Sequence, residues 1–161
     1  MSLLGDFAVY HGERRVALPP ASQRLVAIVA MKRKPVHRLW VCAKLWPNAH
    51  IPRAVASLRS AMWRLRPAGA EPLLTVDPQY LQLSPDVYVD WHHSADLIER
   101  LLDGDADTQL VSDLLPLLRA GDLLDRWLER WVINDRDQYH VMRKTALRMI
   151  ADRCAPEPSA P

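Results

Sequence analysis

Hydrophobic and polar positions alternate in two short stretches of the first half of the chain. Residues 7–10 alternate, a turn-like His-Gly-Glu follows, and residues 14–19 continue in an extended pattern. A period of two is typical of half-buried strands, so these residues predict a β-hairpin. The same alternation recurs on both sides of an Asp-Pro turn over residues 73–83, which predicts a second hairpin.

Between the two hairpins the hydrophobic period becomes that of a helix. Leu25, Ile28 and Val29 fall at i, i+3 and i+4, and Ser22 precedes them as a candidate N-cap. Residues 36–47 predict a second, short helix that is apolar nearly all round, so we expect it to be buried on more than one side.

A third helix is predicted over residues 52–66, between two prolines, and its two faces differ. Leu58, Met62 and Leu65 gather on one side of a helical wheel, which predicts the side that packs against the first two helices. The other side is small, hydroxylic and cationic, with one large ring and no acid. It comprises Arg53, Ala56, Ser60, Trp63 and Arg64, flanked by Arg59 and Arg66 on one edge and Ser57 on the other.

The second half of the chain reads as helical. One amphipathic helix starts near Asp90, which is a candidate cap, and another follows the acidic residues 103–107 and contains Pro116. The last predicted helix runs from about residue 128 to about residue 153. Its apolar stripe consists of Tyr139, Met142, Ala146, Met149 and Ile150.

Charge divides the 161 residues into unlike halves. Residues 1–84 carry twelve Lys and Arg against four Asp and Glu, a net +8, whereas residues 85–161 carry nine against fifteen, a net −6. Such asymmetry indicates that the first half meets a polyanion. The chain is 49% hydrophobic, which is enough to build the core of one large domain or two small ones.

Other features of the composition favour a cytoplasmic protein. Cys42 and Cys154 are the two cysteines, without the spacing of a zinc site, which is usual for a reduced, intracellular protein. No apolar run approaches the ~20 residues of a membrane span, and the first ten residues lack the basic start of a signal peptide.

The outer side of the third predicted helix suits duplex DNA. A major groove admits one α-helix, and a small residue such as Ala56 allows close approach. Arginines offer planar donors to phosphates or guanine edges, and the hydroxyls of Ser57 and Ser60 can reach phosphates. Trp63 packs either on sugars and thymine methyl groups or on another part of the protein. The second hairpin has no basic residue at its tip, so we expect any contact that it makes with DNA to be weaker or to come from Gln79 or Tyr80.

Several segments resemble a known family. LPPASQRLVAIVA, LWP, ASLRSAMWRLR and LQLSPDVYVD resemble the winged-helix domain of the SARP family, the antibiotic regulatory proteins of actinobacteria, whose fold is similar to OmpR-type effector domains. GDLLDRWLERWVINDRDQYHVMRKTALRMIADR resembles the bacterial transcriptional activation domain of that family. The resemblance implies an α+β protein: an OmpR-like winged helix-turn-helix domain over residues 1–88, then a small all-α, tetratricopeptide-like helical domain over residues 89–155, and a flexible tail over residues 156–161.

The resemblance also implies a function. Members of the family bind direct repeats near promoters and recruit RNA polymerase, often to switch on secondary-metabolite gene clusters. We therefore expect a transcriptional activator whose partners are double-stranded DNA, RNA polymerase and a second copy of the chain on a direct repeat, with no cofactor. The predicted DNA-binding residues are Arg53, Ser57, Arg59, Ser60, Trp63, Arg64 and Arg66.

The chain departs from the family in ways that keep alternatives open. His37 stands where a serine commonly caps the second helix, and Leu39 and Trp40 stand where polar residues are usual. The helical domain is also less than half the usual length. These features suit a protein-interaction adaptor that keeps the winged-helix fold without binding DNA, or a small-molecule sensor in the helical half. Four arginines and no acid within residues 53–66 favour DNA.

Residues 103–108 match only part of a calcium-loop pattern. Asp103, Asp105 and Asp107 occupy positions 1, 3 and 5, but Thr108 and Leu114 stand where the loop needs glycine and glutamate. We expect a solvated linker and no metal.

Chemistry-bearing residues elsewhere do not assemble a catalytic motif. Asp90, His92, His93 and Asp96 are close in sequence, but adjacent histidines on a helix diverge by about 100°, which is unfavourable for sharing a metal ion. Cys42 lies in an apolar helix and reads as core. No nucleophile elbow or phosphate-binding loop is present, so we do not expect an enzyme.

Overall fold

A computed structural model of the chain describes residues 1–105 and 107–154. The predicted tail of residues 156–161 lies outside the described residues. The chain folds into two compact units. The first unit contains Met1–Ser2 and Phe7–Val89, and the second contains Leu3–Asp6 and the described residues from Asp90 onward.

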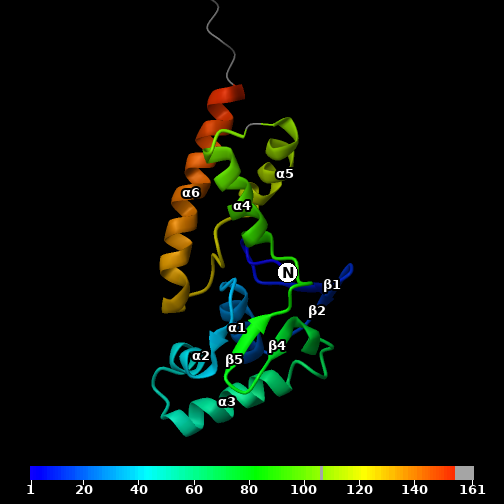
Figure 1. Cartoon of the computed structure of the whole chain (residues 1–161), viewed down its shortest axis with the longest axis vertical. Helices are drawn as coiled ribbons and strands as arrows, with labels where there is room; N and C mark the ends of the chain where they lie inside the picture. Colours follow the sequence, from blue (N-terminus) through cyan, green and yellow to red (C-terminus); the bar gives the residue numbers. More distant parts are fainter. Residues whose placement is uncertain (106, 155–161) are drawn as a thin grey trace, which may run out of the picture. The chain divides into compact units, whose positions relative to one another are not determined.

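The first unit combines three helices with two small antiparallel sheets (Figure 1). The expected order of a hairpin, three helices and a second hairpin is confirmed. The first sheet pairs β1 (Val9–His11) with β2 (Arg14–Val16), and the helices are α1 (Pro20–Ala30), α2 (Arg38–Leu45) and α3 (Ile51–Trp63). The second sheet has the order β3-β5-β4, formed by β3 (Val36–His37), β4 (Leu74–Val76) and β5 (Tyr80–Leu83), and a short 3-10 turn (Glu71–Leu73) precedes β4.

Helix α1 forms the centre of this unit. Every residue from Leu25 to Ala30 is buried, and the helix packs against α2, α3 and β5. The predicted capping role of Ser22 is wrong, because Pro19 occupies the N-cap and the helix starts at Pro20. Ser22 is instead fully buried, and its hydroxyl donates a hydrogen bond of 2.8 Å to the carbonyl of Ala61 in α3.

Helix α2 is buried on one side only. Val41, Cys42 and Leu45 are buried, and burial raises the pKa of the Cys42 thiol. Cys42 is thus a core residue, as expected. The prediction of burial on more than one side is wrong for Leu39, which is 48% exposed. The ring of Trp40 lies near the ammonium groups of two lysines, Lys32 at 5.9 Å and Lys44 at 5.8 Å.

The second unit is helical. It contains α4 (Asp90–Leu102), α5 (Thr108–Arg119) and α6 (Arg130–Cys154), and α4 packs against both of the others. Within the predicted stripe of α6, Tyr139, Ala146 and Ile150 are buried and the two methionines are half-buried. The Tyr139 hydroxyl shares a buried hydrogen bond of 2.7 Å with the hydroxyl of Ser94 in α4.

A segment from the start of the chain completes the helical unit. Leu3–Asp6 runs beside the residues that follow α5. The Gly5 amide donates to the Asp122 carbonyl (2.7 Å), the Leu124 amide donates to the Leu3 carbonyl (2.8 Å), and the Leu3 amide donates to the Asp90 carboxylate (2.7 Å). Asp90 therefore connects the start of α4 to a segment distant in sequence, a pairing that local patterns do not predict.

The described part of the chain is therefore an α+β structure with two small sheets and six α-helices. Within that part, no helix is both long enough and apolar enough to cross a membrane.

Candidate nucleic-acid interface

Helix α3 is shorter than the sequence predicted. It was expected over residues 52–66, but it begins at Ile51 and ends at Trp63, with Arg64 as its C-cap. The helical conformation is disfavoured just before Pro67, and the chain instead closes in tight turns, in which Leu65 donates to the Met62 carbonyl (3.1 Å). Arg64 and Arg66 therefore lie beyond the regular helix.

The inner side of α3 is fixed against the rest of its unit. Ala54, Leu58 and Ala61 are buried, and Leu65 is only 2% exposed although it lies in the turn after the helix. The hydrogen bond from Ser22 to Ala61 joins this side to α1. The predicted packing side is confirmed for Leu58 and Leu65, whereas Met62 is only half-buried and lines a hollow. The direction of the outer side follows from the two buried leucines.

The outer side of α3 presents the residues that the sequence proposed as DNA contacts. Arg53, Arg59 and Ser60 are exposed, and Ser57 is half-buried at the edge. Trp63 is 69% exposed, so the alternative that its ring packs on another part of the protein is not supported in the described structure. The helix therefore offers cations, hydroxyls and one open aromatic ring along one side.

The two arginines after the helix differ in their surroundings. Arg64 is exposed. The Nε of Arg66 lies 3.4 Å from a carboxylate oxygen of Glu71, and both side chains are more than 60% exposed. An ion pair this open to water contributes little energy, so Glu71 partly neutralises Arg66 without holding it rigidly.

A hollow of about 350 Å³ lies between α3, the start of α2 and the tip of the β4–β5 hairpin. Arg59 of α3 and Arg38 of α2 line it together with Leu39 and Gln79. The Nε of Arg38 is buried there without a hydrogen-bond partner among the described residues. Sequence reasoning missed Arg38, because only the folded sheet brings the start of α2 beside the hairpin.

His37 caps the N-terminus of α2. Its Nδ1 accepts the amide of Leu39 at 3.2 Å, at the first turn of α2. Its ring meets the ring of Tyr80 edge-on, with centroids 5.4 Å apart. His37 and Tyr80 are also paired across β3 and β5, so the start of α2 is attached to the hairpin.

The tip of the β4–β5 hairpin is held by Asp77. One carboxylate oxygen accepts the backbone amides of Gln79 and Tyr80, each at 2.7 Å. These two hydrogen bonds, first that from Tyr80, hold the pKa of the Asp77 carboxyl below its ordinary value. The tip is thus anionic, and the arginine that a wing would use in a minor groove is not there.

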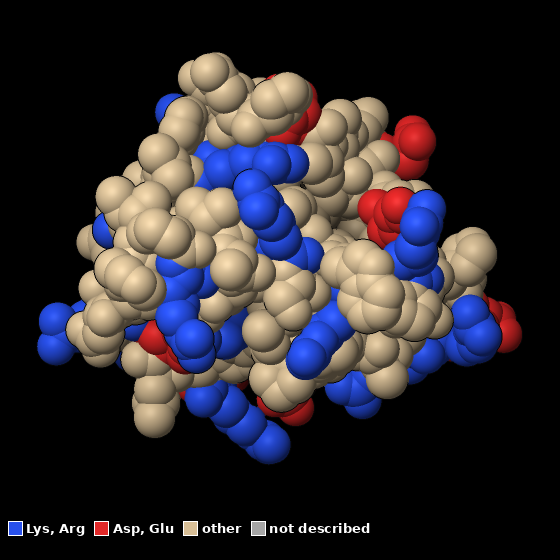
Figure 2. Space-filling model, turned by 90° about the horizontal axis from the view of Figure 1, so that it is seen from below, with Lys and Arg blue, Asp and Glu red and all other residues tan. Residues whose placement is uncertain are grey.

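Cations dominate the side of the first unit that carries α3. Figure 2 looks onto this side and shows many Lys and Arg side chains with few Asp or Glu among them. This distribution agrees with the net +8 of residues 1–84. A field of this sign attracts polyanions such as nucleic acid.

The acidic residues considered for calcium have other roles in the described structure. Asp105 accepts two hydrogen bonds from the guanidinium of Arg100, at 3.0 and 2.6 Å, and Asp107 caps α5 by accepting the Gln109 amide. Residues 1–105 and 107–154 contain no group of three or more His, Cys, Asp or Glu placed to hold a metal ion.

Comparison with solved structures places the fold. The chain is similar to the structure titled "Mycobacterium tuberculosis EmbR in complex with low affinity phosphopeptide", with a TM-score of 0.54 and 21% sequence identity over 94% of this chain. A likeness at this level of identity shows the fold alone. The match spans 41% of the EmbR chain, so this chain corresponds to about two fifths of its length.

Comparison with protein-family models gave no match. Comparison with curated proteins also gave no match.

Proposed function

We propose that the chain is a sequence-specific DNA-binding transcriptional regulator that places α3 in the major groove. The observation that carries this proposal is the division of α3 into a buried side and a cationic, acid-free outer side. The predicted residues serve as contacts: Arg53, Ser57, Arg59, Ser60, Trp63, Arg64 and Arg66.

The shortened helix changes how these residues contact DNA. Arg53, Arg59 and Ser60 lie on the regular helix, where side chains can reach base edges. Arg64 and Arg66 lie in the turns that follow, where they reach phosphates flanking the groove. Base contacts give specificity and phosphate contacts give affinity. The residues on the helix therefore supply specificity, and the two arginines after it supply affinity.

The second unit is proposed to act in activation. Its helical composition and its resemblance to the SARP activation domain support a tetratricopeptide-like module that contacts RNA polymerase, with a second copy bound to an adjacent direct repeat. Under this proposal the protein works in the cytoplasm and switches on a biosynthetic gene cluster.

Selection of duplexes from a random DNA pool by the full chain tests the proposal. We expect enrichment of a motif read by one α3, and of two such motifs in direct repeat if two copies bind. The matched control is Arg59→Ala, which alters an exposed side chain and should lose the enrichment while keeping the melting temperature. A folded parent chain that enriches no sequence would overturn the proposal.

One observation favours the second candidate, an adaptor that does not bind DNA. Leu39 is 48% exposed beside the half-buried Trp40, on a helix whose other side forms the core. Such a pair can anchor a protein partner. The selection experiment separates the two candidates, because an adaptor enriches no duplex.

A further inference from the structure

The tip of the β4–β5 hairpin carries a fixed negative charge. Asp77 is exposed, and its carboxylate accepts the amides of Gln79 and Tyr80 at 2.7 Å. Two short hydrogen bonds to backbone amides hold the side chain over its own turn. The charge therefore cannot swing away from an anion that approaches the tip.

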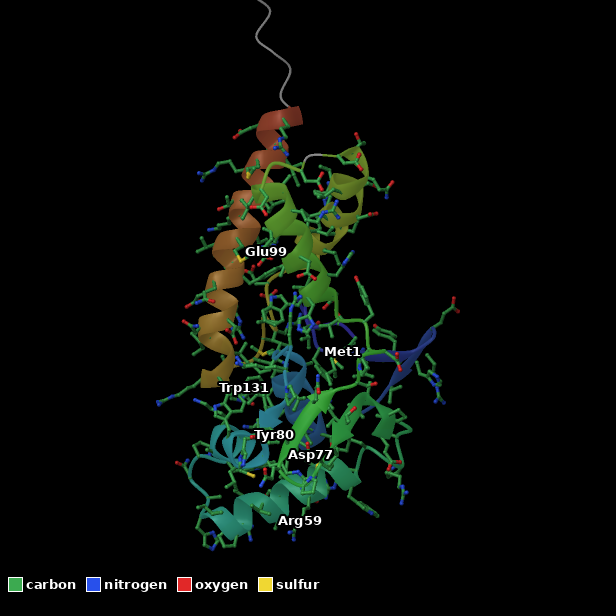
Figure 3. All side chains as sticks on the ribbon, in the orientation of Figure 1. Met1, Arg59, Asp77, Tyr80, Glu99 and Trp131 are labelled. Carbon is green, nitrogen blue, oxygen red and sulfur yellow. The ribbon has the colours of Figure 1, made fainter. Side chains whose placement is uncertain are left out.

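This charge stands beside the cations of the proposed interface. Pro78 and Gln79, the next two residues of the tip, line the hollow together with Arg38 and Arg59. Figure 3 labels Asp77 and Tyr80 on the hairpin and Arg59 on α3. The hydrogen bonds from Tyr80 and Gln79 do most to lower the Asp77 pKa, and the guanidinium of Arg38 adds a smaller contribution in the same direction. Asp77 thereby offsets part of the positive field of Arg38.

A carboxylate in this position opposes binding to the DNA backbone. Phosphate contacts give an affinity that does not depend on sequence, and each phosphate neutralised adds about 0.9 to the salt slope. A negative charge near the path of the backbone removes part of that attraction on every sequence. A larger share of the affinity must then come from base contacts made by α3.

We propose that Asp77 lowers the sequence-independent part of DNA binding by repelling the DNA backbone from the hairpin tip. The inference rests on the proposed function, because it needs DNA on α3. In this inference the hairpin repels the DNA backbone, whereas a wing that carries an arginine binds the minor groove.

Asp77→Asn in the full chain tests the inference. Asparagine keeps an oxygen that can accept both amides, so the turn persists while the charge is lost. We expect affinity for duplex DNA to rise roughly two- to fivefold at low salt, the range that exposed charge interactions give. The gain should be equal for the selected duplex and for a scrambled one, and the salt slope should steepen by about one.

Two further variants make the test specific. Glu13→Gln removes one exposed carboxylate of the same unit, in the turn between β1 and β2, and should leave affinity within the error of the parent. Gln79→Glu adds a charge at the tip and should lower affinity on both duplexes, by a factor similar to the gain from Asp77→Asn. It reports on the tip even if Asp77→Asn fails to fold.

The outcomes separate the two proposals. A parent chain that binds no duplex overturns the proposed function and this inference with it. A parent that binds, with Asp77→Asn and Gln79→Glu indistinguishable from it, overturns the role of Asp77 alone. A gain confined to one duplex sequence also contradicts it, because repulsion of the backbone acts on all sequences.

Discussion

The buried hydroxyl of Ser22 donates a 2.8 Å hydrogen bond to the main-chain carbonyl of Ala61. Ala61 lies in the last turn of α3, where carbonyls have no intrahelical partner four residues ahead. A side chain from α1 thus satisfies the end of α3 and sets the helix rotation that turns Arg59 and Ser60 outward.

Replacing Ser22 with alanine should destabilise the first unit. The Ala61 carbonyl would remain buried without this partner, so we expect the free energy of unfolding to fall by about 1–3 kcal/mol. Urea denaturation followed by circular dichroism measures the change. Ser60→Ala, on the exposed side of the same helix, is the matched control and should change stability by less than about 0.5 kcal/mol.

Substitution of Gly5 tests the pairing of Leu3–Asp6 with the rest of the helical unit. Its φ is +69°, and a Cβ at this position would lie 2.6 Å from the carbonyl oxygen of Ala120. Gly5→Ala therefore combines backbone strain with a clash against main chain, and we expect a loss of at least about 1–3 kcal/mol.

The control for this glycine is Gly12, whose φ is +60° but whose Cβ would meet nothing within 4 Å. Gly12→Ala carries the strain alone, so its melting temperature should fall less than that of Gly5→Ala. Equal losses in the two variants would contradict the close approach of Gly5 to Ala120.

The burial of Tyr139 should make the protein less stable at alkaline pH. Burial raises the pKa of Tyr139 above its ordinary value, although the hydrogen bond with Ser94 acts in the opposite direction. Because the folded pKa exceeds the unfolded one, this contribution is fully present below about pH 10 and is lost as pH rises through the folded pKa.

Tyr139→Phe should remove the part of the stability loss at alkaline pH that comes from ionisation of Tyr139. It should also lower stability at neutral pH by about 1–3 kcal/mol, because the Ser94 hydroxyl loses its partner. Denaturation curves at pH 7 and pH 11 measure both effects. If the stability of Tyr139→Phe falls as steeply between pH 7 and pH 11 as that of the parent, the effect comes from another tyrosine.

The sequence predicted those parts of the fold that repeat locally. Alternation over residues 7–10 and 73–83 located both hairpins, and the helical period located the buried side of α3. Other features depend on contacts between distant residues. β3 has only two residues, which are too few to show a hydrophobic period. The sequence around Ser22 is typical of an N-cap, and the hydrogen bond of Ser22 to α3 depends on the packing of two helices.

The candidate site was also predicted only in part. The wheel placed Leu58 on the buried side and Arg53, Arg59 and Ser60 on the exposed side correctly, because a helix fixes direction at each position, but Met62 is only half-buried. It placed Arg64 and Arg66 on a helix that ends at Trp63. It also omitted Arg38 and the charge of Asp77, since the sheet that carries them to α3 is not a local property.

Arg64 and Leu65 are neighbours that should respond differently to alanine. Arg64 is exposed, so Arg64→Ala should keep the melting temperature and weaken binding, with the salt slope reduced by about one if it contacts a phosphate. Leu65 is 2% exposed, so Leu65→Ala should lower stability by about 2–5 kcal/mol through a core cavity. If Arg64→Ala binds as tightly and with the same salt slope as the parent, Arg64 is not a DNA contact.

The central claim is that the cationic side of α3 binds duplex DNA. The most direct measurement is a titration of labelled duplex with the full chain at several salt concentrations, beside Arg59→Ala. The account predicts that log K falls linearly with log salt by about 0.9 per phosphate neutralised, and that Arg59→Ala weakens binding at every salt concentration. A folded chain that fails to bind at low salt, or whose affinity does not change with salt or with Arg59→Ala, would contradict it.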